Sequence, residues 1–100
     1  MTKYTIKYTT QFKKDIKRAQ KANLDITLLK DIVAKLANGE ELDVKHKDHS
    51  LKGIWVNHRE CHIQPDWLLL YLKEYDDKIK KNVLVLTLVN TGTHSDIFKK

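Results

Sequence analysis

The stretch CHIQPDWLLLYL, residues 61–72, joins a polar segment to an almost unbroken apolar run. The apolar half predicts a strand inside a sheet, covered on both faces. A second run of this kind, VLVLTLV, follows at residues 83–89. Pro65 interrupts the pairing before the first run, because proline has no N–H to donate. We therefore expect three strands at about residues 54–64, 67–75 and 82–90, the last two joined by the hairpin loop YDDKIKKN, residues 75–82.

The first half of the chain predicts one strand and two helices. YTIKYT, residues 4–9, alternates apolar and polar residues, as an edge strand does. QFKKDIKRAQKA, residues 11–22, has a narrow apolar stripe and a broad basic surface, and Thr9 or Thr10 can cap this helix. A second helix with a strong apolar face is expected at about residues 25–37.

Gly39 follows the second helix and is suited to a left-handed C-terminal cap. Residues 40–53 are predicted to form a polar loop that Gly53 closes. The order β-α-α-β-β-β predicts an α+β fold: a small, mainly antiparallel sheet with an αα-hairpin packed on one face.

Composition limits the class of protein. The chain has 100 residues, 41% of them hydrophobic, which suits a single folded domain over residues 1–100. A net charge of +6 and a pI near 9.4 favour a polyanionic partner such as nucleic acid, although solubility alone also explains a basic surface. No apolar run is long enough to span a membrane and no export signal is found, so we expect a cytoplasmic protein. The single cysteine, Cys61, allows no internal disulfide and is expected to be a small core residue.

Polar side chains gather just before the first apolar run. In RECHIQ, residues 59–64, strand alternation places Cys61 and Ile63 on one face of the sheet. His62 points to the other face, away from these apolar neighbours, and shares that face with Glu60 and Gln64.

Asp66 follows at the strand break, where its carboxylate can stay solvated, and Trp67 anchors the next strand. His49 lies in the polar loop and His94 comes after the last strand. Antiparallel neighbours bring strand ends and loops together, so we hypothesise that these histidines reach the same groove as His62.

Three histidines and a carboxylate allow two main kinds of chemistry. A metal site is disfavoured, because the ends of HIQPD, residues 62–66, lie about 13 Å apart in an extended chain. General acid–base catalysis on RNA fits better, since imidazole exchanges protons near neutral pH and RNA carries its own 2′-hydroxyl nucleophile. Arg59 and nearby lysines can stabilise the phosphate. Ser50 and Ser95 are weaker candidates for a nucleophile, because neither lies in a nucleophile-elbow sequence. The remaining histidines, His46 and His58, are expected at the surface.

Three motifs, KDHSLKG (47–53), RECHIQPDWLLLYL (59–72) and TGTHSDIF (91–98), resemble the YafQ group of RelE-type toxins. Members of this group are ribosome-dependent mRNA interferases of bacterial toxin–antitoxin pairs. The resemblance extends to FKKDIKRAQK in the first helix and so covers nearly the whole chain; only the linker KEYDDKIKKN is longer than is usual in the group. It implies a small RelE-like sheet backed by two helices.

The resemblance also implies a site and partners. The site set comprises His49, His62, Asp66, His94 and Phe98. Trp67 would support Asp66 and, with Arg59 and Phe98, contact the substrate. We expect His94 to act as general acid, Asp66 with His62 as the base side, and His49 to orient the phosphate, although acid and base could be exchanged. Phe98 would stack on a base, and Arg59 would bind backbone phosphate or only pack. The implied substrate is mRNA in the ribosomal A site beside rRNA, the implied protein partner is an acidic antitoxin, and no cofactor is needed.

Two other functions remain open from the sequence. ParE-type toxins share the fold and inhibit DNA gyrase, but that activity gives no reason for three histidines in these three motifs. A non-catalytic RNA-binding module would be expected to carry aromatic platforms on its sheet, and the central strands here present aliphatic residues instead.

Overall fold

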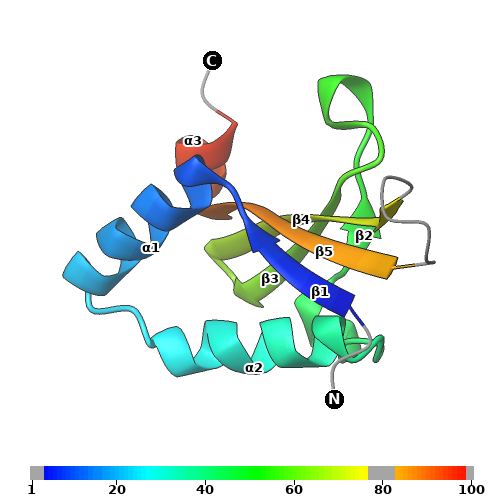
Figure 1. Ribbon diagram of the computed structural model, residues 1–100. Helices are drawn as coiled ribbons and strands as arrows, with labels where there is room; N and C mark the ends of the chain where they lie inside the picture. Colours follow the sequence, from blue (N-terminus) through cyan, green and yellow to red (C-terminus); the bar gives the residue numbers. More distant parts are fainter. Residues whose placement is uncertain (1–3, 77–82, 99–100) are drawn as a thin grey trace.

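A computed structural model describes residues 4–76 and 83–98 of the chain (Figure 1). Its strands join in one five-stranded sheet. In chain order the elements are β1 (Tyr4–Tyr8), α1 (Thr10–Lys21), α2 (Ile26–Ala37), the 3₁₀ helix η1 (Val44–His46), β2 (His49–Ser50), the 3₁₀ helix η2 (Gly53–Trp55), β3 (Arg59–Gln64), β4 (Trp67–Asp76), β5 (Val83–Gly92) and α3 (His94–Ile97).

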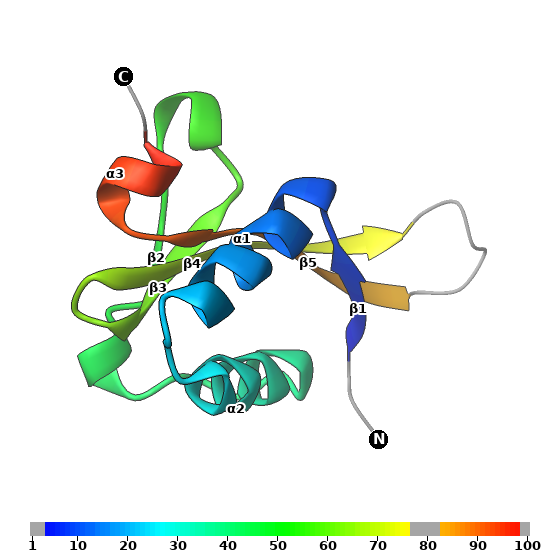
Figure 2. The ribbon, with the colours of Figure 1, turned by 90° about the vertical axis from the view of Figure 1, so that its left-hand side faces the viewer.

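The strand order is β1-β5-β4-β3-β2, with β1 parallel to β5 and the other neighbouring pairs antiparallel. The two apolar runs form β4 and β5, which have neighbours on both sides, and β1 lies at an edge as predicted. Figures 1 and 2 show α2 below the sheet and the short α3 on its other side. The predicted α+β fold, with a mainly antiparallel sheet and a packed αα-hairpin, is confirmed.

Both long helices begin at a side chain that accepts an N-terminal amide. The Thr9 hydroxyl accepts the amide of Phe12 at 2.9 Å, and the Asp25 carboxylate accepts that of Thr27 at 3.0 Å. After α2, Gly39 has a φ of +76°, the left-handed conformation that was expected of it.

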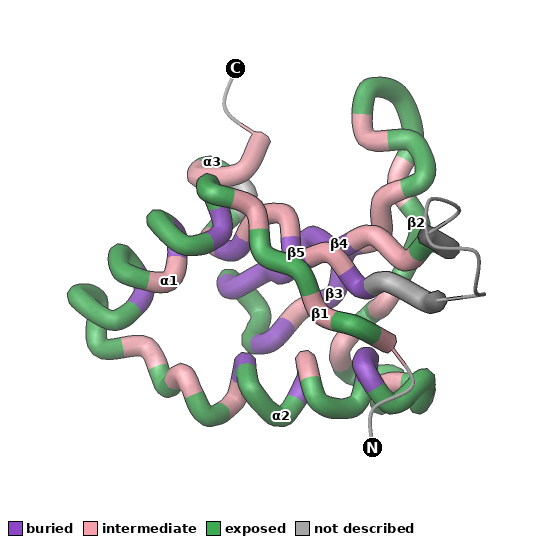
Figure 3. The backbone as a smooth tube through the Cα atoms, in the orientation of Figure 1, coloured by how far each residue is buried: buried purple, intermediate pink, exposed green. Residues whose placement is uncertain are grey.

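The core lies between the helix pair and one face of the sheet, where the buried positions gather in Figure 3. Alternation decides which strand residues reach it: Cys61 and Ile63 of β3 are buried there, as predicted. The helices contribute Phe12, Ala19, Leu29, Ile32, Leu36 and Ala37, and the central strands contribute Trp67, Leu69, Tyr71, Leu86 and Leu88. None of the helices in the described ranges is long and apolar enough to cross a membrane.

The segment before β3 differs from the prediction in two ways. Residues 54–58 are not a strand: positive φ angles of +70° at Gly53 and +73° at Asn57 turn the chain, and η2 forms between them. The predicted polar loop also contains a strand, β2, only two residues long, which pairs with β3. Residues 77–82 of the predicted hairpin loop lie outside the described residues, although the strands that they connect are paired up to Asp76 and Val83.

Candidate active site

Two histidines share one carboxylate on the sheet face opposite α2. The pairing of β2 with β3 sets His49 directly across from Glu60. The Nε2 atom of His49 lies 3.3 Å from Glu60 Oε1, and Nε2 of His62 lies 3.5 Å from the same oxygen. We refer to His49, Glu60 and His62 as the His–Glu cluster.

Burial differs sharply within the cluster. The side chain of Glu60 is only 4% exposed, whereas that of His62 is 17% exposed and that of His49 is 49% exposed. A buried carboxylate is costly unless partners satisfy it, and the two imidazoles do so here. The arrangement therefore holds two rings at the surface on a fixed, buried acceptor.

Backbone carbonyls orient the other nitrogen of each ring. Nδ1 of His49 is 3.1 Å from the carbonyl oxygen of Ser50, and Nδ1 of His62 is 3.3 Å from that of Pro65. Each ring thus faces an acceptor on both sides, and its protonated form can donate to both. These contacts fix the orientation of both rings.

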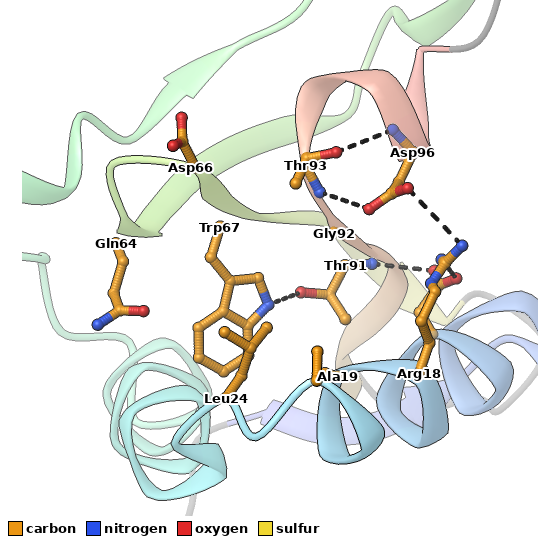
Figure 4. Close-up of a pocket in the computed structure, with 12 residues that line it drawn as sticks. Arg18, Ala19, Leu24, Gln64, Asp66, Trp67, Thr91, Gly92, Thr93 and Asp96 are labelled. Atoms are coloured by element: carbon orange, nitrogen blue, oxygen red, sulfur yellow. Dashed lines mark hydrogen bonds and ion pairs between the residues drawn. The ribbon is translucent and has the colours of Figure 1, made fainter.

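The predicted residues of the β3–β4 turn have different positions. Asp66 is exposed, as expected at a strand break, and Figure 4 shows it directed away from α1. Trp67 points the other way and is only 3% exposed. Its indole N–H donates to the Thr91 hydroxyl at 2.9 Å, and that hydroxyl donates to the carbonyl of Leu68 at 2.6 Å. So buried a ring cannot make the direct substrate contact expected of Trp67. Trp67 instead supports the β3–β4 turn.

The C-terminal segment is fastened to α1. The Asp15 carboxylate, 2% exposed, accepts the backbone N–H of Thr91 at 3.1 Å and the side chain of Arg18. Arg18 also reaches Asp96 of α3 at 3.9 Å, and Asp96 accepts the N–H of Thr93 at 3.0 Å. These contacts, drawn in Figure 4, border a cavity of about 280 Å³ between α1, the β3–β4 turn and α3.

The remaining predicted residues of the C-terminal motif lie in or next to α3. His94 is its first residue, but its side chain is outside the described part of the structure. Phe98 is half-buried, and its ring meets the Trp55 ring edge-on with centroids 5.8 Å apart. This contact ties the segment after α3 to η2.

Arg59 is partly committed within the protein. Its Nε donates to Asp48 at 3.0 Å, and its side chain is 41% exposed. The structure therefore gives Arg59 a packing partner, one of the two roles expected for it, and leaves part of the guanidinium at the surface.

Three expectations outside the cluster can be compared with the structure. His46 is not a free surface residue: its Nδ1 lies 2.6 Å from the carbonyl oxygen of His62 and ties η1 to β3. His58 is half-exposed and meets the Trp55 ring edge-on. Cys61 is a buried core residue, as predicted, and burial raises the pKa of its thiol.

Sequence reasoning missed Glu60 as the carboxylate that joins the histidines, and expected Asp66 in that place. Alternation put Glu60 on the correct face, but its burial depends on β2, which has no sequence signal of its own.

The His–Glu cluster also has the composition of a metal site, which the sequence disfavoured. Its three ligand atoms lie within 4.8 Å of one another, a set of two imidazoles and a carboxylate that could hold a transition metal ion. The spacing within residues 62–66 disfavours a metal, whereas this set takes one ligand, His49, from β2.

The chain matches the family described as "Bacterial toxin of type II toxin-antitoxin system, YafQ" over residues 4–99. It is 37% identical over 99 residues to the mRNA interferase toxin YafQ of Escherichia coli strain K12, an alignment that covers 98% of this chain and 99% of the relative.

Two solved structures agree with this. The crystal structure of YafQ from E. coli strain BL21(DE3) superposes with a TM-score of 0.83 at 34% identity, covering 95% of this chain and 98% of the other. YafQ in the E. coli DinJ–YafQ toxin–antitoxin complex superposes with a TM-score of 0.79 at 37% identity, covering 96% and 98%. The family match and the shared fold thus define a toxin of a type II toxin–antitoxin system. Within that class, the chain belongs to the YafQ family, which confirms the resemblance seen in the sequence.

Proposed function

We propose that this toxin is an endoribonuclease that cuts mRNA by acid–base catalysis, with the RNA 2′-hydroxyl attacking the adjacent phosphate. The observation that carries the proposal is the His–Glu cluster: two partly exposed imidazoles on one buried carboxylate, Glu60. Attack by a 2′-hydroxyl needs a group that removes its proton, a group that protonates the leaving 5′-oxygen, and positive charge at the phosphate. Imidazoles supply all three near neutral pH.

Exposure and the family resemblance support the following roles. His62, with exposed Asp66 four residues further on, forms the base side. His49, the most exposed member of the cluster, orients and neutralises the phosphate. His94 is proposed as the general acid, and Phe98 beside it as the platform on which a base stacks, a contact worth about 1–3 kcal/mol in single-strand binders. No metal ion enters the scheme, because the substrate contains its own nucleophile.

The proposed setting is the ribosomal A site in the cytoplasm, with rRNA as well as mRNA in contact with the toxin. A net charge of +6 supports binding to a polyanion, and the exposed lysines of α1 add to it: Lys13, Lys14, Lys17 and Lys21. The proposed protein partner is an acidic antitoxin, because the related E. coli toxin forms a complex with DinJ and a basic surface favours an acidic partner.

Cleavage of mRNA on programmed ribosomes by purified variants tests the proposal. His62→Ala and His94→Ala should each lower kcat by at least about 10²-fold, the range for loss of a general acid or base. His46→Ala is the matched control: within the described residues its imidazole bonds to a backbone carbonyl and not to a side chain of the His–Glu cluster, so the change should cost stability and leave kcat close to that of the wild type. Circular dichroism and antitoxin binding check the fold.

Full activity in His62→Ala and His94→Ala would contradict the mechanism. Intact mRNA together with inhibited gyrase supercoiling would instead favour a gyrase inhibitor, and ribosome binding without either effect would favour a non-catalytic RNA-binding module.

A further inference from the structure

The strand that carries His49 has little to hold it in place. β2 is two residues long and lies at the edge of the sheet, with His49 opposite Glu60 and Ser50 opposite Arg59 as its only register pairs. Edge strands this short are weakly fixed by their own hydrogen bonds. Nevertheless, the His49 ring must stay within hydrogen-bonding range of Glu60 for the cluster to exist.

The residue before His49 is anchored on the other side of the sheet. Asp48 accepts the Tyr71 hydroxyl at 2.5 Å through Oδ2 and Arg59 Nε at 3.0 Å through Oδ1. Tyr71 is a fully buried residue of β4 within the core between helices and sheet. Successive side chains point to opposite faces, so Asp48 reaches this core while His49 faces the open side.

These contacts follow the register of the sheet, in which each set of partners across neighbouring strands forms one rung. The first rung comprises Ser50, Arg59 and Tyr71 of β2, β3 and β4, and the next comprises His49, Glu60 and Leu70. The Asp48 carboxylate bonds to two members of the first rung, one residue from the cluster on the second. A shift of Asp48 would therefore move His49 against Glu60.

Both hydrogen-bond donors to Asp48 keep their protons at cellular pH. Burial and then the Asp48 carboxylate raise the pKa of Tyr71 far above its ordinary value, so the phenol keeps its proton. The guanidinium of Arg59 is always charged. The anchor thus keeps its hydrogen bonds over the pH range in which histidines exchange protons.

We infer that Asp48, held by Tyr71 and Arg59, is a positioning residue that sets the place of His49 in the active site. This Asp48 anchor rests on the proposed function for its effect on cleavage, but its effect on the geometry of His49 does not depend on activity. Its chemistry is a charge-assisted hydrogen-bond pair whose purpose is orientation.

A double-mutant cycle tests the anchor. Tyr71→Phe removes one hydroxyl and keeps the ring in the core; Asp48→Asn weakens both contacts and keeps the shape. Each should lower kcat for mRNA cleavage by about tenfold with little change in KM, because misplaced catalytic groups lose rate before they lose binding. In a His49→Ala background, Tyr71→Phe should change kcat by less than about twofold, since the group it positions is gone.

A stability-matched control separates positioning from simple destabilisation. Leu29→Ala removes core volume in α2, away from the cluster, and should leave kcat unchanged below its melting temperature. If Tyr71→Phe lowers kcat equally in the wild-type and His49→Ala backgrounds, or no more than Leu29→Ala does, the inference is overturned.

NMR resonances of the histidine rings report the geometry at His49 without a measurement of activity. In Tyr71→Phe the ring resonances of His49 should shift, while those of His58, on the turn after η2, stay in place. Unchanged His49 resonances would overturn the anchor even if the wild type cleaves RNA. Shifted resonances in a wild type that cleaves nothing would support the anchor and contradict the proposed function.

Discussion

The imidazole of His49 lies 3.3 Å from the buried carboxylate of Glu60, although eleven positions separate them in the chain. The contact exists because β2 pairs antiparallel with β3 and sets these two residues opposite each other. His62, two residues after Glu60 on the same face, completes the cluster from the other side. One buried carboxylate therefore organises two partly exposed rings.

Replacing Glu60 by glutamine should lower kcat by about tenfold or more, since the amide keeps the shape but loses the negative charge that both rings face. Ribosome-dependent mRNA cleavage measures the effect. Glu74→Gln is the matched control, because Glu74 is exposed near the far end of β4 and should tolerate the change. Equal activity of the two variants would show that the charge of Glu60 has no part in catalysis.

Gly92→Ala should displace α3. A Cβ at this position would lie 2.9 Å from Cβ of Asp96, and φ is already +154°. We expect a loss of about 2–3 kcal/mol in the free energy of unfolding, together with reduced cleavage, because α3 begins with His94. Urea denaturation and the cleavage assay measure the two effects.

Gly53→Ala serves as the comparison for that variant. Its φ is +70°, but an added Cβ meets nothing within 4 Å, so only backbone strain of about 1–2 kcal/mol is expected. Were both glycine variants equally stable and active, the contact between Gly92 and Asp96 would not be what limits this position.

The stability of the toxin should fall in alkaline solution because of Cys61. Burial raises the pKa of this thiol above its ordinary value of 9.0, so the thiol ionises in the unfolded chain but not in the folded one. This contribution is fully present below pH 9.0 and is lost as the pH rises above that value. Between about pH 8 and about pH 10 the free energy of unfolding should drop by about 1.4 kcal/mol more than in Cys61→Ala. Parallel curves for the two proteins would contradict this account.

Transition metals should inhibit the enzyme rather than activate it. Zinc bound by the His–Glu cluster would occupy ring nitrogens to which the proposed mechanism assigns proton transfer. Phenanthroline, which chelates zinc and spares the magnesium that ribosomes need, should leave cleavage within about twofold of its starting rate. Added zinc should inhibit, and the chelator should reverse the inhibition. A complete loss of activity on chelation would show that the metal-free scheme is wrong.

The sequence alone determined the elements whose signals are local. The apolar runs at residues 67–72 and 83–89 predicted the central strands, and periodicity and capping residues predicted both long helices, because these depend on neighbours within a few positions. Alternation also put His62 on the face opposite Cys61, and the motifs identified the family.

The tertiary structure decided which carboxylate the histidines share and what holds them. A two-residue strand has no periodicity to detect, so the sequence predicted neither β2 nor the contact of His49 with Glu60. The bond from Tyr71 to Asp48 likewise spans 23 positions and forms only because the sheet brings three strands into register. The sequence therefore showed which side chains can take part in the chemistry. Their distances across the sheet depend on the pairing of strands that lie far apart in the chain, and contacts throughout the fold stabilise this pairing.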